Sequence, residues 1–336
     1  MNFDAIRIVS LSFLIRKVND MRREEFWALE RIVEEENEWR HLPENVYTRD
    51  KKALVSIISS TQRELKESIR LAVNKIGGLR KSFKKEDCVL LKANYNSDDP
   101  FPASTDPDFL VAAVEFFKEE GITNLTLGER SGWPWMPTAD VLNEMGVFQT
   151  AKSLELPIID FDSGPWMDVR IGEEAKWWEK VGFHKSLKDF DKIVFLPCMK
   201  HHALARFTMS LKLTVGLTHP VDMRHIHADR ALGKTDEPME LKMVELGIPV
   251  APDLIIMDGR KSFVTGGPAN GEIVQPNVIL ASGDRLAIDV EGVKILQSYP
   301  RENLIQMPPW EIPSIQRAVE LGLGVAGEEE YIVEKI

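Results

Sequence analysis

The chain has 336 residues, of which 43% are hydrophobic, so it is long enough to bury a large core. Its formal net charge of −11 argues against a general nucleic-acid-binding protein, which needs a surface that neutralises phosphates. The two cysteines, Cys88 and Cys198, exclude a disulfide framework and a four-cysteine zinc or iron–sulfur centre within this chain. Neither a signal peptide nor an apolar run of about twenty residues is found, which predicts a cytoplasmic protein with no membrane partner.

Residues 1–50 differ from the rest of the chain and are expected to form a helical arm. Asp20 can cap a helix with an apolar stripe at helical spacing, made of Phe26, Trp27, Leu29, Ile32 and Val33. Such a stripe packs either on the body of the protein or on a second copy of the chain, so a homo-oligomer through the arm is one expectation. Residues 51–336 would then form an α/β body, as one unit or as two lobes that meet near residues 165–200.

The middle of the chain alternates between apolar runs and amphipathic segments. Residues 53–58 predict a strand, and the next helix is expected to open on a capping box at residues 61–64 and to end at Gly77. Asp106 is expected to cap a later helix, because a proline such as Pro107 is typical of the first helical turn.

Six further strands are predicted. A helix capped by Thr138 is expected after the second of these strands, and a helix that begins at Asp284 is expected after the last. Their positions are residues 88–93, 124–129, 157–161, 192–197, 254–259 and 277–282. Near-continuous apolar strands are buried on both faces, which is typical of parallel sheets covered by helices. The predicted fold is therefore α/β and Rossmann-like, with a mostly parallel sheet and helices on both faces.

Ligands of open α/β sheets bind at the carboxyl ends of the strands, and polar loops follow several strands here. After the strand at 88–93, four residues are candidates for binding a cofactor or an anion: Lys92, Asn94, Ser104 and Thr105. The two hydroxyl residues stand at a helix start, where free backbone N–H groups attract anions. Helix capping alone also explains both of them.

A second polar loop follows the strand at 254–259. Asp258, Gly266 and Gly267 are its cofactor-binding candidates, because glycines let a ligand approach the backbone closely. The next predicted helix carries Asp289 in an apolar run, where a buried carboxylate needs a partner.

A third loop is basic and rich in histidine. Five of the seven histidines lie within residues 201–227, and imidazole is both the commonest metal ligand and an acid–base group near neutral pH. His202, His225 and His227 are the predicted ligands of a divalent metal, with the last two on one side of an extended segment. The alternative is that individual histidines cap helices or pair with carboxylates.

The predicted catalytic residues come from the same stretch: His202, Lys200 and Lys212. If its segment is helical, Lys212 is flanked by apolar residues and is partly buried. A buried lysine has a lowered pKa and can act as a base or a nucleophile. The alternative is a lysine that extends to solvent. Together with Lys92 and Arg206, these lysines predict a basic pocket for a small anionic ligand in an acidic protein.

Five segments, in this order, resemble the family known as domain of unknown function 362. They are VLLKANY, STDPDFLVAAVEFFKEEG, LPCMKHHALARFTMSLKLTVGL, DGRKSFVTGGPANGE and ILASGDRLAID, and the resemblance covers about residues 53–300. Some members carry a ferredoxin-like iron–sulfur module whose cysteines are absent here. The family usually has Lys-Asn where this chain has Lys212-Leu213, so no role of that asparagine carries over.

More distantly, the chain resembles the nickel-pincer lactate racemases. In that family a lysine anchors the pincer nucleotide, and histidines bind nickel and shuttle protons. His202 and Lys212 have a similar order and separation, with His225 and His227 further on, although ALARFTMSL replaces the family's glycine-rich stretch. The resemblance implies an enzyme with racemase-like or isomerase-like proton transfer. The alternative is a non-catalytic protein that carries a metal or a cofactor.

Overall fold

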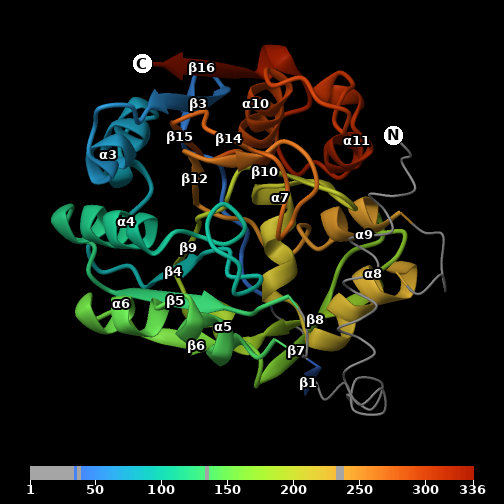
Figure 1. Ribbon diagram of the computed structural model, residues 1–336. Helices are drawn as coiled ribbons and strands as arrows, with labels where there is room; N and C mark the ends of the chain where they lie inside the picture. The colour runs from blue at the N-terminus through green and yellow to red at the C-terminus, as the bar shows by residue number, and fades with distance from the viewer. Residues whose placement is uncertain (1–33, 36–38, 133–135, 232–237) are drawn as a thin grey trace.

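The computed structural model describes residues 34–35, 39–132, 136–231 and 238–336 (Figure 1). Within them, nine strands form one mixed sheet in the order β16–β3–β15–β12–β9–β4–β5–β6, with β2 paired beside β3. The strands are β2 Thr48–Arg49, β3 Lys52–Ser59, β4 Val89–Lys92, β5 Leu125–Glu129, β6 Ile158–Asp160, β9 Lys192–Phe195, β12 Leu254–Gly259, β15 Val278–Ser282 and β16 Tyr331–Lys335.

Most neighbouring strands of this sheet run parallel. Strands β12, β9, β4, β5 and β6 are paired in parallel, and β16 is parallel to β3. The main exception is β15, which pairs antiparallel with both β12 and β3. The predicted α/β fold with a mostly parallel sheet is therefore confirmed. Because β4 and β5 are parallel neighbours, their carboxyl-terminal residues, Lys92 and Glu129, lie at the same edge of the sheet.

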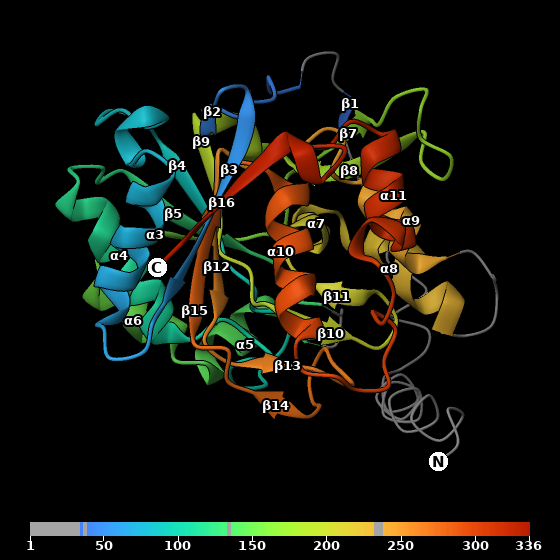
Figure 2. The same ribbon diagram turned by 90° about the horizontal axis from the view of Figure 1, so that it is seen from above.

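Helices cover both faces of the sheet, as predicted. Figure 2 shows α3, α4 and α6 on one side of the strands and α7, α10 and α11 on the other. Each side has its own buried apolar core, because the strands are apolar on both faces. The helices are α3 Leu65–Lys75, α4 Pro107–Glu119, α5 Thr138–Glu144, α6 Val147–Ser153, α7 Ser210–Leu213, α8 Pro220–Ala231, α9 Met239–Glu245, α10 Arg285–Gln297 and α11 Pro313–Glu320.

Two of the predicted helix starts are confirmed and two are wrong. Asp106 accepts a hydrogen bond from the Asp108 N–H (3.1 Å), and Asp284 likewise caps α10. The predicted capping box at residues 61–64 is wrong, because α3 begins at Leu65 and Glu64 makes no side-chain cap. Thr138 is the first residue of α5 rather than its cap; its hydroxyl accepts a hydrogen bond from the Ser131 N–H instead (2.8 Å).

Three small sheets were not predicted. One hairpin pairs β7 (Trp166–Arg170) with β8 (Lys180–His184), and the short β1 (Glu34–Glu35) adds to it. Another pairs β10 (Lys200–His202) with β11 (Arg206–Thr208), inside the histidine-rich stretch. The third pairs β13 (Ser262–Phe263) with β14 (Ile273–Val274) in the glycine-containing loop. These strands have two to five residues, too short for the alternation of side chains to identify them.

The helix predicted after Asp20 lies outside the described residues, so the arm and the oligomer through it stay predictions. The part of the arm that is described packs on the body: the Trp39 indole N–H donates to the Pro249 carbonyl (2.7 Å), and Tyr47 is fully buried. Within the described ranges, no helix combines the length and the apolar composition that a membrane crossing requires.

Candidate functional site

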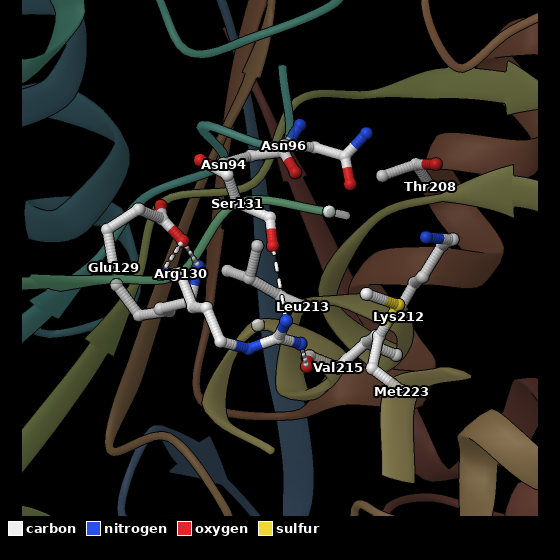
Figure 3. Close-up of a pocket in the computed structure, with 13 residues that line it drawn as sticks. Asn94, Asn96, Glu129, Arg130, Ser131, Thr208, Lys212, Leu213, Val215 and Met223 are labelled. Atoms are coloured by element: carbon white, nitrogen blue, oxygen red, sulfur yellow. Dashed lines mark hydrogen bonds and ion pairs between the residues drawn. The ribbon is translucent and has the colours of Figure 1, made fainter. Parts of the chain in front are cut away.

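A cavity lies at the carboxyl ends of β4 and β5, where α7 also contributes to its lining (Figure 3). Its free volume is about 30 Å³, and it is partly open to solvent. A water molecule needs roughly 10–15 Å³ by this measure, so the cavity holds about two or three waters or a molecule of similar size. The lining residues are Lys92, Asn94, Asn96, Glu129, Arg130, Ser131, Gly132, Thr208, Lys212, Leu213, Val215, Gly216 and Met223.

A buried ion pair joins the two strand ends that form the floor of the cavity. The Lys92 ammonium donates to the Glu129 carboxylate and to the Ala93 carbonyl (2.6 Å). Glu129 also accepts from the backbone N–H groups of Tyr95 (3.0 Å) and Arg130 (2.9 Å). Burial lowers the pKa of Lys92, and the Glu129 carboxylate opposes that shift. Because the two charges balance, this pair adds no net charge to the cavity.

Arg130 adds a positive charge with no carboxylate bonded to it in the described part of the chain. Its guanidinium donates to the carbonyls of Ser131 (3.2 Å) and Val215 (3.0 Å), while its Nε has no partner within those residues. Burial lowers the pKa of Arg130 to about 10, which leaves it charged at neutral pH. No pattern in the sequence pointed to this arginine.

Lys212 extends its amine into the cavity from α7. Within the described residues the amine has no hydrogen-bond or ion-pair partner, and the residue is half-buried. Burial, together with the positive charges of Lys200 and Lys92, lowers the pKa of Lys212 to about 7. In Figure 3 this side chain lies on the same side of the cavity as Thr208, opposite Glu129. The prediction of a partly buried lysine is confirmed.

Asp289 fixes the turn that carries Lys212. Its fully buried carboxylate accepts from the Ser210 hydroxyl (2.7 Å), the Ser210 N–H (2.9 Å) and the Leu211 N–H (2.9 Å). These contacts cap α7, which is only one turn long and continues as a 3₁₀ turn over Thr214–Leu217. Lys212 thus lies in a helix, although a short one, and the expected partner of Asp289 is found.

Two neutral polar groups complete the wall around Lys212. Thr208 is 3% exposed, and its hydroxyl has no partner within the described residues. Asn96 is half-buried and lines the same cavity. Buried hydroxyl groups are normally hydrogen-bonded, so the Thr208 hydroxyl is a group that a ligand could satisfy.

Several of the predicted site residues lie outside the lining and use their polar groups in contacts within the protein. The Lys200 ammonium is fully buried and donates to the carbonyls of Ala103 and Pro268, and burial lowers its pKa to about 8. The hydroxyl of Ser104 donates to the Ser97 carbonyl (2.7 Å). Two more are Thr105, whose hydroxyl accepts from the Asn94 N–H, and Arg206, which pairs with Glu240.

The glycine-containing loop packs against β10. Gly266 and Gly267 have φ values of +63° and +71°, a backbone conformation that glycine adopts without strain. The Gly266 carbonyl accepts from His201 (2.9 Å), and a Cβ at Gly267 would overlap the His201 carbonyl. Asp258 forms an ion pair with Arg260 (2.7 Å). None of these three candidates lines the cavity.

Replacing Gly267 with alanine is expected to destabilise the protein without changing ligand binding directly. The Cβ would meet the backbone of β10, and the positive φ adds strain, so we expect a loss of about 1–3 kcal/mol. Urea denaturation measures this loss. Gly146→Ala is the matched control, because Gly146 also has a positive φ (+69°) but a Cβ there would meet no described atom within 4 Å. Equal losses in both variants would contradict the packing role.

Three histidines of the predicted cluster make hydrogen bonds to the backbone. His202 Nδ1 accepts from the N–H groups of Leu204 (3.1 Å) and Ala205 (3.0 Å), and His219 Nδ1 accepts from Val221 (3.1 Å) at the start of α8. His201 Nε2 accepts from Leu304 (3.3 Å). In a neutral imidazole the other nitrogen then carries the proton. These contacts favour the alternative in which the histidines cap turns.

The predicted metal ligands His225 and His227 lie in α8, so the extended segment expected there is wrong. Residues two apart in a helix do not share a face. The side chain of His227 is outside the described residues, and among those described no group of three metal-ligating side chains occurs. The divalent metal site stays a prediction, and we derive no chemical step through a metal.

Comparisons with known proteins find a relative in sequence, two solved structures of similar fold and a matching family model. A thylakoid-associated protein of Synechocystis is 26% identical over 290 residues, which cover 82% of this chain and 81% of that protein. The lactate racemase apoprotein from Thermoanaerobacterium thermosaccharolyticum is 14% identical with a TM-score of 0.45, and the match covers 74% of this chain and 59% of that one. A protein of Thermotoga maritima is 13% identical with a TM-score of 0.43, and the match covers 69% of this chain and 57% of that one.

The chain thus spans less than two thirds of the length of either solved structure. The family model described as a domain of unknown function, DUF362, matches residues 89–294, which is more than half of the 336 residues. The matched range runs from β4 to α10, so it contains every residue that lines the cavity. The chain therefore belongs to the DUF362 family, as its sequence motifs predicted.

Proposed function

We propose that the protein binds a small anion, such as a carboxylate or a phosphate group, in the cavity around Lys212. The observation that carries the proposal is the Lys212 amine, which has no partner among the described residues. Arg130 contributes a second positive charge, whereas the only carboxylate in the described lining, Glu129, is paired with Lys92. A bound anion would balance the positive charges of the cavity and would accept hydrogen bonds from Thr208 and Lys212.

We further propose that Lys212 transfers a proton to or from the bound molecule. A general acid–base group works best when its pKa lies near the operating pH, and burial lowers the pKa of Lys212 to about 7. Apolar side chains of Leu213, Val215 and Met223 limit water around the amine. A small acid with an exchangeable C–H proton next to a carboxylate is the substrate class that fits this arrangement.

Titration calorimetry with inorganic phosphate, malonate and lactate tests the binding proposal. The protonated form of Lys212 attracts an anion and the neutral form does not. Affinity should therefore fall as the pH rises through about 7, by up to about tenfold per pH unit. Thr208→Val should weaken binding, and Lys75→Met, which removes an exposed lysine of α3, should not. Binding that is equally strong at about pH 6 and about pH 9 would contradict the role of Lys212.

A non-catalytic carrier is the second candidate. It is favoured by the hydrogen bonds of His201, His202 and His219 to the backbone, which engage the imidazoles that a proton relay would use. Exchange of the lactate C2 proton in D₂O, followed by NMR, separates the two candidates. Incorporation of deuterium that depends on Lys212 supports proton transfer, and tight binding without incorporation supports the carrier.

A further inference from the structure

We infer that Lys212 is a carbamylation site, at which the neutral amine takes up carbon dioxide to form a lysine carbamate. The inference concerns the same cavity as the proposed function but the other protonation form of Lys212, so the two can fail separately. Three features of the described residues support it: an amine free to react, a cavity of the right size, and surroundings that stabilise a negative charge.

The amine is free to react because nothing in the described chain occupies its lone pair or its N–H groups. Lys92 and Lys200 differ in this respect, since both donate to backbone carbonyls, and Lys92 also pairs with Glu129. Because burial and neighbouring cations lower the pKa of Lys212 to about 7, a large share of the amine is neutral at physiological pH. An ordinary exposed lysine is almost entirely protonated there.

The free volume of the cavity is about 30 Å³. A carbamate adds three heavy atoms to the lysine nitrogen, which is close to the two or three waters that this volume holds. Leu213, Val215 and Met223 form an apolar part of the lining that suits neutral carbon dioxide. A larger modification would have to extend through the open side of the cavity.

The surroundings favour an anion at the end of this side chain. Carbamylation changes the charge of Lys212 from positive to negative, in a cavity whose lining also includes Arg130 and Lys92, and the charge of Lys92 acts on Lys212. The Thr208 hydroxyl is buried and has no partner in the described chain, and it can donate to a carbamate oxygen. The Asn96 amide lines the same wall and can donate to the second oxygen (Figure 3).

The reaction needs no oxidant, reductant or further reactant. The lone pair of Nζ forms an N–C bond to the carbon of CO₂, and one C=O π pair moves onto oxygen. Nζ then releases one proton to solvent. The reaction is reversible, so the modified fraction depends on the concentration of carbon dioxide and rises with pH as Lys212 loses its proton.

The test incubates the full chain with ¹³C-bicarbonate and carbon dioxide at about pH 8, where most of Lys212 is neutral. Carbon-13 NMR should show a protein-bound carbamate signal that saturates as carbon dioxide rises. Trapping with triethyloxonium, digestion and mass spectrometry should place the label on Lys212 and leave the exposed Lys75 unlabelled. Thr208→Val should lower the carbamate formation constant by about tenfold, because one hydrogen bond to a charged group is lost.

Lys212→Arg is the matched variant, since arginine keeps the positive charge but stays protonated and cannot form the carbamate. It should lose the carbamate signal. If that variant does not fold, the peptide map of the unaltered protein decides. An unlabelled Lys212, or equal labelling of Lys212 and Lys75, overturns the inference. Phosphate binding measured in parallel shows whether the proposed function survives that result.

Discussion

Replacing Lys212 with methionine is expected to abolish anion binding in the cavity and to stabilise the folded protein. Methionine removes the charge that attracts the anion while filling a similar volume. The stabilisation follows from the pKa, which burial lowers from its ordinary value of 10.5 to about 7. Holding the buried ammonium therefore costs folding free energy, as is common for groups positioned for function.

The lowered pKa of Lys212 determines how the stability of the protein changes with pH. Between about pH 7 and 10.5 the unfolded chain holds the Lys212 proton and the folded chain does not, so this group makes stability rise with pH. Below about pH 7 both states are protonated and the cost is constant. Lys212→Met removes this pH-dependent cost. The free energy of unfolding of the variant should therefore exceed that of the unaltered protein most at low pH.

Calorimetric melting at a series of pH values measures the effect. At about pH 6 we expect the melting temperature of Lys212→Met to be higher by roughly 1–3 °C, with the difference shrinking toward about pH 10. Lys75→Met should leave the melting temperature unchanged at every pH, because Lys75 is exposed. A Lys212→Met protein that is less stable at every pH would show that the lysine packs rather than serves a ligand.

Replacing Glu129 with glutamine is expected to cause the largest loss of stability among these variants. Glu129 is 1% exposed and balances the ammonium of Lys92, which is equally buried. Removing one partner leaves an uncompensated buried charge, which typically costs about 3–5 kcal/mol. Glutamine also weakens the hydrogen bonds from the N–H groups of Tyr95 and Arg130, which hold the loops after β4 and β5 together.

Urea denaturation of Glu129→Gln, Lys92→Met and the double variant tests the pair. The double variant should lose less free energy of unfolding than the two single variants together, because it leaves no unpaired buried charge. Glu115→Gln is the surface control: it breaks the exposed pair with Lys66 and should cost less than about 1 kcal/mol. If Glu129→Gln costs no more than Glu115→Gln, the buried pair does not stabilise the fold.

The binding consequence of Glu129→Gln separates structure from function. Removing the only carboxylate in the described lining makes the cavity more positive, so phosphate affinity per folded molecule should rise or stay constant. Lost stability with retained binding would show that the pair holds the floor of the cavity and takes no part in recognising the anion.

Several elements could be predicted from the sequence because their signals are local. The strands at β4, β9 and β12 are continuous apolar runs, and Asp106 and Asp284 cap helices through residues two or three positions away. The family could also be predicted, because ordered motifs remain visible in the sequence. Lys92, Asn94 and Lys212 were expected near one another because they follow or precede buried segments, and all three line the cavity.

The remaining site residues depend on contacts between distant parts of the chain. Arg130 reaches the Val215 carbonyl across 85 positions, and Ser210 meets Asp289 across 79. No local pattern distinguishes a lysine with a free amine from one whose charge is already used. Lys200 and Lys212 look alike in sequence, yet only the fold turns Lys200 onto the carbonyls of Ala103 and Pro268.

The sequence by itself determined the α/β class, the family and the edge of the sheet at which polar loops gather, because hydrophobic burial and helix capping act between near neighbours. The tertiary structure decided which of the gathered side chains face a common space. It brought His201, His202 and His219 into hydrogen bonds with the backbone and left Lys212 and Thr208 lining the cavity. The reason is that free hydrogen-bonding capacity is a property of three-dimensional packing, in which each buried polar group bonds to whatever the fold brings near it.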